Sequence, residues 1–224
     1  ASDVYKRQEF GKAVSGETKV DILVTPFVTM LIGSLVAVVV GPPIGAFMIA
    51  LGNVIMWATE QQPIIMGIVI SVVVGVVLTL PISSAALCIM LNLSGIAAGA
   101  ATVGCCCQMV GFAVQSYKEN GIGGLAAQGL GTSMIQVPNI IKNWRIWIPP
   151  TAASAVLGPL ATTVFQMQNT PVAAGMGTCG LVGQIGTVMA MTEAGQPMIQ
   201  IVLGIGLLQI ILPAAMTMIF YKLC

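Results

Sequence analysis

The sequence contains a charge-free run from Gln61 to Tyr117, which is long enough to cross a lipid bilayer more than once. Crossing the hydrocarbon core takes about 20 apolar residues, and further charge-free runs cover residues 22–59, 146–192 and 194–221. Charged residues make up 7% of the chain and hydrophobic residues 57%, whereas a soluble domain carries roughly 25% charged residues. The sequence therefore predicts an all-α, polytopic membrane protein with about six to eight transmembrane helices.

The chain is expected to form one membrane domain over residues 22–222, truncated at both ends. Residues 1–8, ASDVYKRQ, are interpreted as an adapter-like scar, and residues 9–21 as a polar lead-in. Gly-Pro-Pro at 41–43 predicts a break between a first helix over 22–40 and a shorter one over 44–58. Pro63 opens a helix that runs to about residue 80, and Pro81 interrupts the chain after it. Further helices are expected over 96–116, 146–167 and 197–221.

Two segments are too polar or too broken to be plain transmembrane helices. Residues 121–141 carry amides and a proline, and residues 171–190 are rich in glycine. If Lys12 and Lys19 lie on the cytoplasmic side, the four expected spans before Lys118 return the chain to that side. A crossing by 121–141 would then place Lys142 and Arg145 on the outer side, against the positive-inside rule. We therefore expect both segments to be re-entrant, because irregular backbone at membrane depth must be buried in protein or line a cavity.

Composition excludes several classes of function. The chain contains no histidine, which excludes His-based acid–base catalysis and a phosphohistidine on this polypeptide. Basic and acidic residues balance once residues 1–8 are set aside, so no nucleic-acid surface is expected. No catalytic residue, cofactor or metal site is evident. Cys105, Cys106 and Cys107, with 14 methionines, raise a soft-metal transporter as a weaker alternative. Adjacent cysteines on a helix point in different directions, however, which favours a packing role.

A cluster of neutral polar residues is the first candidate for a binding site. Gln136 and Asn139 are three residues apart, and Gln128 and Thr132 are four apart, so on a helix each pair shares a face. Amides and hydroxyls both donate and accept hydrogen bonds, which suits sugar-like ligands. The alternative is that these residues hold neighbouring helices together by hydrogen bonds.

Two glutamates and a glycine-rich motif are further candidates. Glu60 and Glu193 lie beside long apolar runs, and an intramembrane carboxylate is a candidate for ligand binding or coupling; the alternative is a solvated helix N-terminus. Residues 175–180, GMGTCG, fit a dinucleotide-binding pattern but lack the strand that such a motif requires. The glycines indicate either close helix packing or a loop whose backbone approaches a ligand. Trp57, Trp144 and Trp147 are expected to be interface anchors.

The order of motifs resembles the phosphotransferase-system (PTS) enzyme IIC family, second type, whose members are often labelled perfringolysin O regulator-like proteins or toxin regulators. The resemblance rests on VGPPIGAF (40–47), TLPISSAAL (79–87), GIAAGAATVGC (95–105), AQGLGTSMIQVPNIIKNWRIWIPP (127–150), GPLATTVF (158–165) and GMGTCGLVGQ (175–184). It implies a homodimeric, multi-pass permease of the bacterial inner membrane, with re-entrant hairpins around a sugar site. It also implies cytoplasmic phosphoryl-transfer partners. Glu193 is nearest to the sugar-binding glutamate of glucose-type relatives, whereas their membrane histidine has no counterpart here.

We therefore predict the permease component of a sugar phosphotransferase system, which binds and translocates a small polar, sugar-like solute. The alternative is a membrane sensor or regulator of gene expression that keeps the permease fold without transport. The candidate solute-binding residues are Glu193, Gln136, Asn139, Gln128, Thr132, Glu60 and Gln184.

Overall fold

The computed structural model describes residues 21–59 and 62–223, and its architecture is all-α. Within these residues the backbone forms helices and turns, with a single isolated bridge between Gly95 and Asn169 and no β-strand. The chain divides into two units, residues 1–51 and residues 52–224, which are described separately. The predicted all-α fold class is confirmed.

Helix α2 (Asp21–Thr59) is continuous where the sequence predicted a break. It passes through Gly41, Pro42 and Pro43 without interruption, so the expected pair of helices over 22–40 and 44–58 is wrong. Proline lacks a backbone N–H, so each one leaves a gap in the helical hydrogen bonds, but its fixed φ near −65° is a helical value. Such gaps are tolerated in apolar helices at membrane depth.

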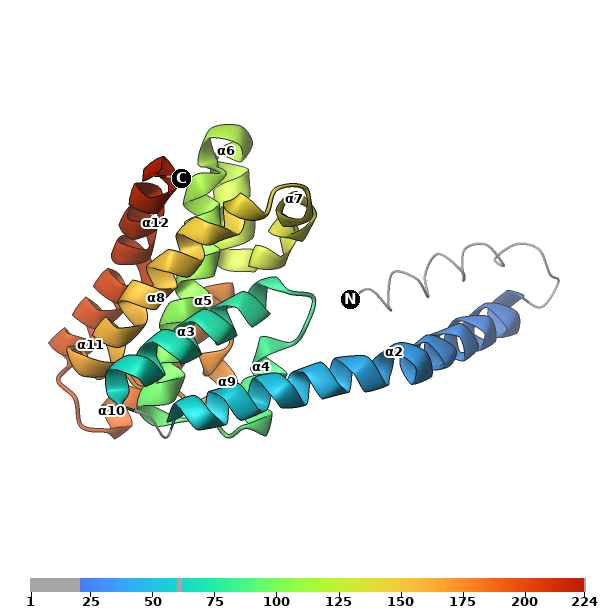
Figure 1. Ribbon diagram of the computed structural model, residues 1–224, viewed down its shortest axis with the longest axis horizontal. Helices are drawn as coiled ribbons and strands as arrows, with labels where there is room; N and C mark the ends of the chain where they lie inside the picture. Colours follow the sequence, from blue (N-terminus) through green and yellow to red (C-terminus); the bar gives the residue numbers. More distant parts are fainter. Residues whose placement is uncertain (1–20, 60–61, 224) are drawn as a thin grey trace. The chain divides into compact units, whose positions relative to one another are not determined.

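Three helices form the centre of the second unit: α3 (Pro63–Thr79), α5 (Gly95–Gln115) and α8 (Ile148–Thr163) (Figure 1). Small residues let these helices approach closely. At the α3–α5 contact, for example, a Cβ on Gly104 would overlap the carbonyl of Ser71. Ser71 Oγ also donates a hydrogen bond to Ser154 O on α8, at 2.8 Å. Helices associate in lipid through this kind of close backbone approach.

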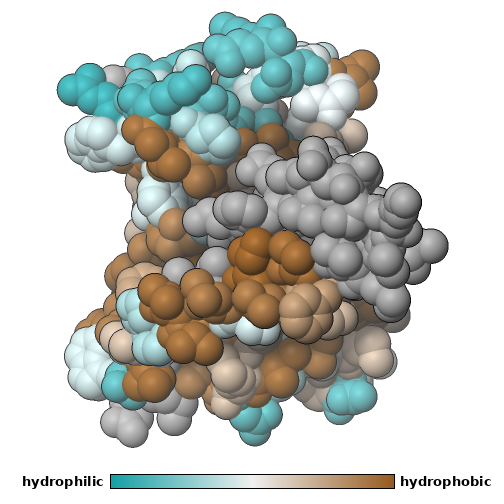
Figure 2. Space-filling model, turned by 90° about the vertical axis from the view of Figure 1, so that its right-hand side faces the viewer, coloured by the Kyte–Doolittle hydropathy of each residue, from teal (hydrophilic) through white to brown (hydrophobic). Residues whose placement is uncertain are grey.

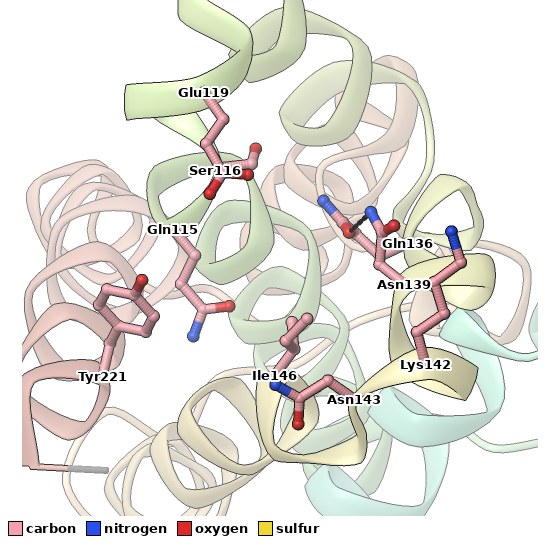
Figure 3. A pocket seen from close by; sticks show the side chains of 9 residues that line it. All are labelled: Gln115, Ser116, Glu119, Gln136, Asn139, Lys142, Asn143, Ile146 and Tyr221. Carbon is pink, nitrogen blue, oxygen red and sulfur yellow. Dashed lines mark hydrogen bonds between the residues drawn. The ribbon is translucent and has the colours of Figure 1, made fainter.

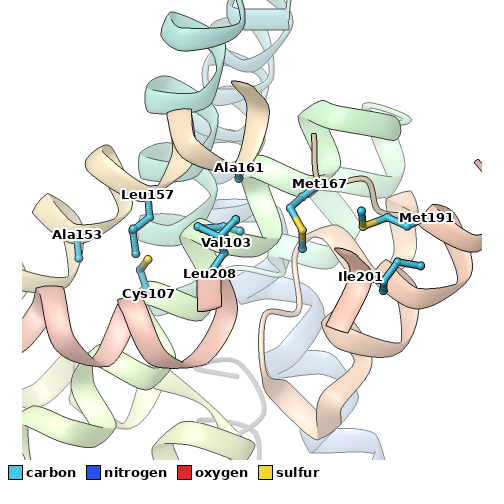
Figure 4. Packing of buried hydrophobic residues seen from close by; sticks show 9 residues of the cluster. All are labelled: Val103, Cys107, Ala153, Leu157, Ala161, Met167, Met191, Ile201 and Leu208. Carbon is cyan, nitrogen blue, oxygen red and sulfur yellow. The ribbon is translucent and has the colours of Figure 1, made fainter. Parts of the chain in front are cut away.

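The C-terminal rod follows Pro197 and consists of α11 (Met198–Gly204), the π-helix η5 (Ile205–Ile211) and α12 (Leu212–Leu223). It packs against α5 and α8 (Figure 1). Buried apolar side chains from α5, α8, the loop after α8, α10, α11 and η5 meet here (Figure 4): Val103, Cys107, Ala153, Leu157, Ala161, Met167, Met191, Ile201 and Leu208. The core therefore lies along the inner side of the rod.

The first broken segment comprises residues 117–147. Its pieces are α6 (Tyr117–Ala126), the π-helix η1 (Ala127–Gly131), the 3-10 helix η2 (Ser133–Gln136), α7 (Val137–Lys142) and the 3-10 helix η3 (Trp144–Trp147). Gly121 kinks α6 with φ +59°. Glu119 near its start and Lys142 near its end line one cavity, so the chain enters and leaves at the same end of the unit. This agrees with the predicted re-entrant path.

The second broken segment comprises residues 164–193. A loop leads into α9 (Pro171–Ala174), then turns, the 3-10 helix η4 (Cys179–Leu181) and α10 (Val182–Glu193). Helix α4 (Ser84–Met90), which follows the predicted interruption at Pro81, packs on α9. Gly177, Gly180 and Leu181 all have positive φ, so no straight helix passes through the glycine-rich motif.

Three helical stretches among the described residues are long and apolar enough to cross a membrane: Gly41–Thr59, Gly95–Gln115 and Met198–Leu223, with Pro63–Thr79 slightly shorter. Three basic residues are exposed at the end of the second unit where α6 and α7 lie: Lys118, Lys142 and Arg145. Lys222 follows Tyr221, which lines the same cavity as Glu119 and Lys142. We call this the charged end. Figure 2 shows hydrophilic residues gathered at this upper end, above a hydrophobic zone. The number of crossings stays a prediction.

Candidate functional site

A polar cavity of about 260 Å³ lies at the charged end. Its walls come from α5, α6, α7 with its flanking turns, and α12 (Figure 3). The lining residues are Gln115, Ser116, Glu119, Gln136, Asn139, Lys142, Asn143, Ile146 and Tyr221. This volume is just below the roughly 300 Å³ at which ordinary ligand pockets begin, which suits a small solute.

Two of the predicted residues, Gln136 and Asn139, lie together on the wall of this cavity. Asn139 Nδ2 donates to Gln136 Oε1 at 2.9 Å, so the predicted sharing of a face is confirmed. Among the described residues, Gln136 Nε2 and Asn139 Oδ1 have no hydrogen-bond partner. The pair therefore presents one free donor and one free acceptor.

Gln115 forms the opposite wall and was not predicted. It is the last residue of α5, and its side chain points into the space between Tyr221 and Ile146 (Figure 3). Both its amide nitrogen and its amide oxygen are buried, and neither has a hydrogen-bond partner among the residues that the structure describes. Leaving buried polar atoms unpaired costs about 1–3 kcal/mol each. The signal in the sequence is an amide at the end of an apolar helix, directly before the polar Ser116.

The cavity carries both signs of charge, from Glu119 at one rim and Lys142 at the other. Asn143, between α7 and η3, accepts a hydrogen bond from Arg145 N through Oδ1 at 3.2 Å, which begins η3. The remaining lining is mainly amide and hydroxyl groups. Such a surface matches a ligand with several hydroxyl groups, since each can both donate and accept.

Gln128 and Thr132 do not share a helix face, which corrects the prediction. The π-helix η1 ends at Gly131, and Thr132 is extended, with φ −158°. Thr132 Oγ1 instead accepts from Met134 N at 3.2 Å and so caps η2. Gln128 is buried, and its Oε1 has no hydrogen-bond partner within residues 21–59 and 62–223. The i, i+4 rule failed because the chain leaves helical geometry between the two residues.

A smaller cavity of about 160 Å³ lies where the two broken segments meet α4. Thr132 lines it together with Ser84 and Cys179. Nearby, Thr178 Oγ1 donates to Gly129 O, which joins the second broken segment to the first. Thr132, which caps η2, lines this cavity, and Gln136, the last residue of η2, lines the polar cavity, so one short helix links the two.

The glycine-rich motif packs against protein rather than facing open space. Gly177 has φ +55°, and a Cβ there would lie 2.8 Å from Cys105 Cβ. Ser84 Oγ donates to Gly175 O at 2.7 Å. Of the two interpretations of the motif, the structure supports close packing. Gln184 follows the motif, is buried, and donates from Nε2 to Cys106 Sγ at 3.6 Å.

The three adjacent cysteines point in different directions, as expected. Cys105 Sγ contacts Val74 O on α3 at 3.8 Å, Cys106 contacts Gln184 on α10, and Cys107 joins the apolar core. Over residues 21–59 and 62–223, no group of three His, Cys, Asp or Glu residues is placed to hold a metal ion.

A buried hydrogen-bond network around Asn169 was also missed from the sequence. Asn169 Nδ2 donates to Thr102 Oγ1 at 2.6 Å and to Gly183 O at 3.1 Å, and its Oδ1 accepts from Thr170 N. Gln209, in the π-helix η5, donates to Thr187 Oγ1 at 3.0 Å. The network fixes the second broken segment to α5 and the rod.

Glu193 lies apart from the amides. It is the exposed last residue of α10, at the opposite end of the second unit from α6 (Figure 1). The rod that begins after Pro197 and reaches Tyr221 spans roughly 35 Å at 1.5 Å per residue. Glu193 and Gln136 therefore do not line one cavity. Glu60, the other predicted carboxylate, lies outside the described residues.

Comparison with known protein families identifies the family of this chain, which the geometry of the site alone does not. The family described as "Phosphotransferase system, EIIC" matches residues 4–224. The chain belongs to this family. As an EIIC protein it is a membrane permease component of a phosphotransferase system, and the resemblance seen in the sequence is confirmed. Searches of curated proteins and of solved structures gave no match.

Proposed function

We propose that this EIIC protein binds a small, neutral, hydroxyl-rich solute of the sugar class in the polar cavity and carries it across the membrane. The observation that carries the proposal is the unpaired Gln115 amide, which faces the Gln136–Asn139 pair across a cavity of about 260 Å³. Sugar hydroxyls would pair with both walls at once. A buried polar group that gains partners recovers the free energy lost when it was desolvated.

The cavity's location supports a role in transport. It lies at the charged end, which the positive-inside rule assigns to the cytoplasm. The short helix η2 links it to the smaller cavity at the meeting of the two broken segments. Irregular backbone of this kind lines solute paths in transporters. We propose the bacterial inner membrane as its location and a homodimer as its working state.

Phosphoryl transfer would involve partner proteins. This chain contains no histidine to carry a phosphoryl group, so cytoplasmic phosphotransferase proteins would donate it to the solute at the charged end. Gln136 and Asn139 are the predicted residues that we place at the solute. Gln128, Thr132, Gln184 and Glu193 stay predictions, because none of them lines this cavity. Glu60 stays a prediction because it lies outside the described residues.

Uptake into proteoliposomes tests the proposal. Radiolabelled hexoses, N-acetylated amino sugars and hexitols are offered with and without phosphoryl donor proteins. We expect uptake of at least one, reduced about tenfold by Gln136→Leu, which removes one hydrogen-bonding amide. Gln196→Leu, an amide change in the turn between α10 and α11, is the matched control and should not alter uptake. Binding without uptake would favour the sensor or regulator, and no binding of any sugar would reject the proposal.

A further inference from the structure

An apolar groove of about 480 Å³ lies between α3 and α8, close to the charged end. Val72 and Val76 of α3 form one side, and Ala152 and Ala155 of α8 form the other. The small side chains on α8 keep the groove open. Its lining is apolar almost throughout, unlike that of the polar cavity.

The two tryptophans of η3 close the groove at the charged end. A 3-10 helix has three residues per turn, so residues three apart lie on one side. Asn143 and Ile146 therefore face the polar cavity, whereas Trp144 and Trp147 face the groove. Trp147 is also fixed through its backbone, because Thr151 Oγ1 donates to Trp147 O at 2.8 Å.

One basic residue neighbours both tryptophans in the chain. Arg145 lies between them in η3 and is exposed, whereas the exposed Lys142, which ends α7, lines the polar cavity. Among the described residues, the charged end carries Lys118, Lys142, Arg145 and Lys222 against Glu119 alone. Tryptophans mark the lipid–water interface, and basic pockets between helices on the cytoplasmic side attract anionic headgroups.

We propose that the groove is a binding site for one anionic glycerophospholipid. An acyl chain would lie between α3 and α8, the two tryptophans would sit at the level of the ester groups, and Arg145 would pair with the phosphate. The apolar lining would hold the acyl chain, and Arg145 would supply the selectivity for an anionic headgroup. This site is separate from the solute cavity and does not depend on which solute is carried.

Tryptophan quenching by brominated lipid tests the site. The full chain, with Trp57 and Trp144 replaced by Phe, retains Trp147 as its single tryptophan. It is reconstituted in vesicles that contain phosphatidylglycerol or phosphatidylcholine brominated on the acyl chain. We expect half-maximal quenching of Trp147 at about fivefold lower mole fraction of the brominated anionic lipid, the gain expected from one basic residue near the membrane surface.

Two charge variants make the test specific. Arg145→Gln should bring the two lipids to equal quenching, whereas Lys118→Gln, which removes a charge from α6 at the same end, should keep most of the preference. Ala155→Phe, which fills the groove, should weaken quenching by both lipids. Equal quenching by both lipids in the parent would overturn the proposal. Absence of quenching by either would also overturn it, because the groove would then be covered by protein, such as a second copy of this chain.

Discussion

The two broken segments use irregular backbone in opposite ways. In the first, the chain kinks at Gly121, unwinds at Thr132, and brings Gln136 and Asn139 to the wall of a polar cavity. In the second, the glycines press against α5, and a Cβ on Gly183 would overlap the carbonyl of Gly177. The first segment therefore exposes side chains to a polar cavity, whereas the second buries its backbone in protein.

This contrast follows from the cost of unpaired backbone in lipid, where each unsatisfied group costs several kcal/mol. A broken helix must either line a cavity that admits water or be covered by neighbouring protein. Amides and hydroxyls at the break favour the first solution, and glycines favour the second. The composition of each segment thus indicates whether it lines a cavity or is covered by protein once the fold brings it against α5.

The largest effect is expected from adding one methyl group to the second segment. Gly183→Ala places a Cβ against Gly177 O and close to Thr102, and this overpacking should lower the free energy of unfolding by about 3 kcal/mol. Gly123→Ala in the first segment should cause no loss, because no atom of the described part of the chain lies within 4 Å of the added Cβ. Unfolding by SDS in mixed micelles measures both. Equal losses of stability in the two alanine variants would contradict this difference between the two broken segments.

The Asn169 network gives the next largest effect. Asn169→Ala leaves Thr102 and Gly183 without their shared donor, so we expect a loss of about 2–3 kcal/mol in the same titration. Asn120→Ala, on the exposed surface of α6, should change stability by less than about 0.5 kcal/mol. A stable Asn169 variant would show that the second segment is held by packing alone.

The first segment should instead affect solute binding. Gln136→Leu removes a cavity amide and should weaken binding of a transported sugar about tenfold, with little change in stability. Isothermal titration with the sugar that gives the highest uptake measures the affinity, with Gln196→Leu as the control. If the variant unfolds while affinity per folded molecule is kept, Gln136 is structural.

The smallest effect is expected at Glu193. Glu193→Gln alters an exposed residue that lies far from the polar cavity, so binding should change less than about twofold, as for most surface substitutions. A tenfold loss would place the solute at the other end of the molecule. That result would restore the prediction that the sequence favoured for this glutamate.

The sequence predicted the parts of the fold that depend on local chemistry. Pro63 at a helix start, the interruption at Pro81 and the glycine-rich break after Pro171 all appear where expected. The continuous α2 was missed, because proline's effect on a helix depends on its surroundings as well as on the missing donor.

The site was only half predictable. Gln136 and Asn139 lie three residues apart, so a local rule finds the pair. Gln115 and Tyr221 join them only because α5 and α12 end beside the same turn, which is tertiary information. The role of Asn169 could not be predicted from the sequence either, since one asparagine in an apolar run can be a loop residue or the centre of a buried hydrogen-bond network.

Solute protection of a single cysteine tests the central claim most directly. Ile146→Cys, in a background with the native cysteines replaced by alanine, places a thiol in the wall of the polar cavity. A membrane-impermeant maleimide should label it from the side that carries Lys142 and Arg145, and a transported sugar at saturating concentration should slow the reaction. Labelling from the opposite side, or at the same rate with every sugar that the protein transports, would contradict the account.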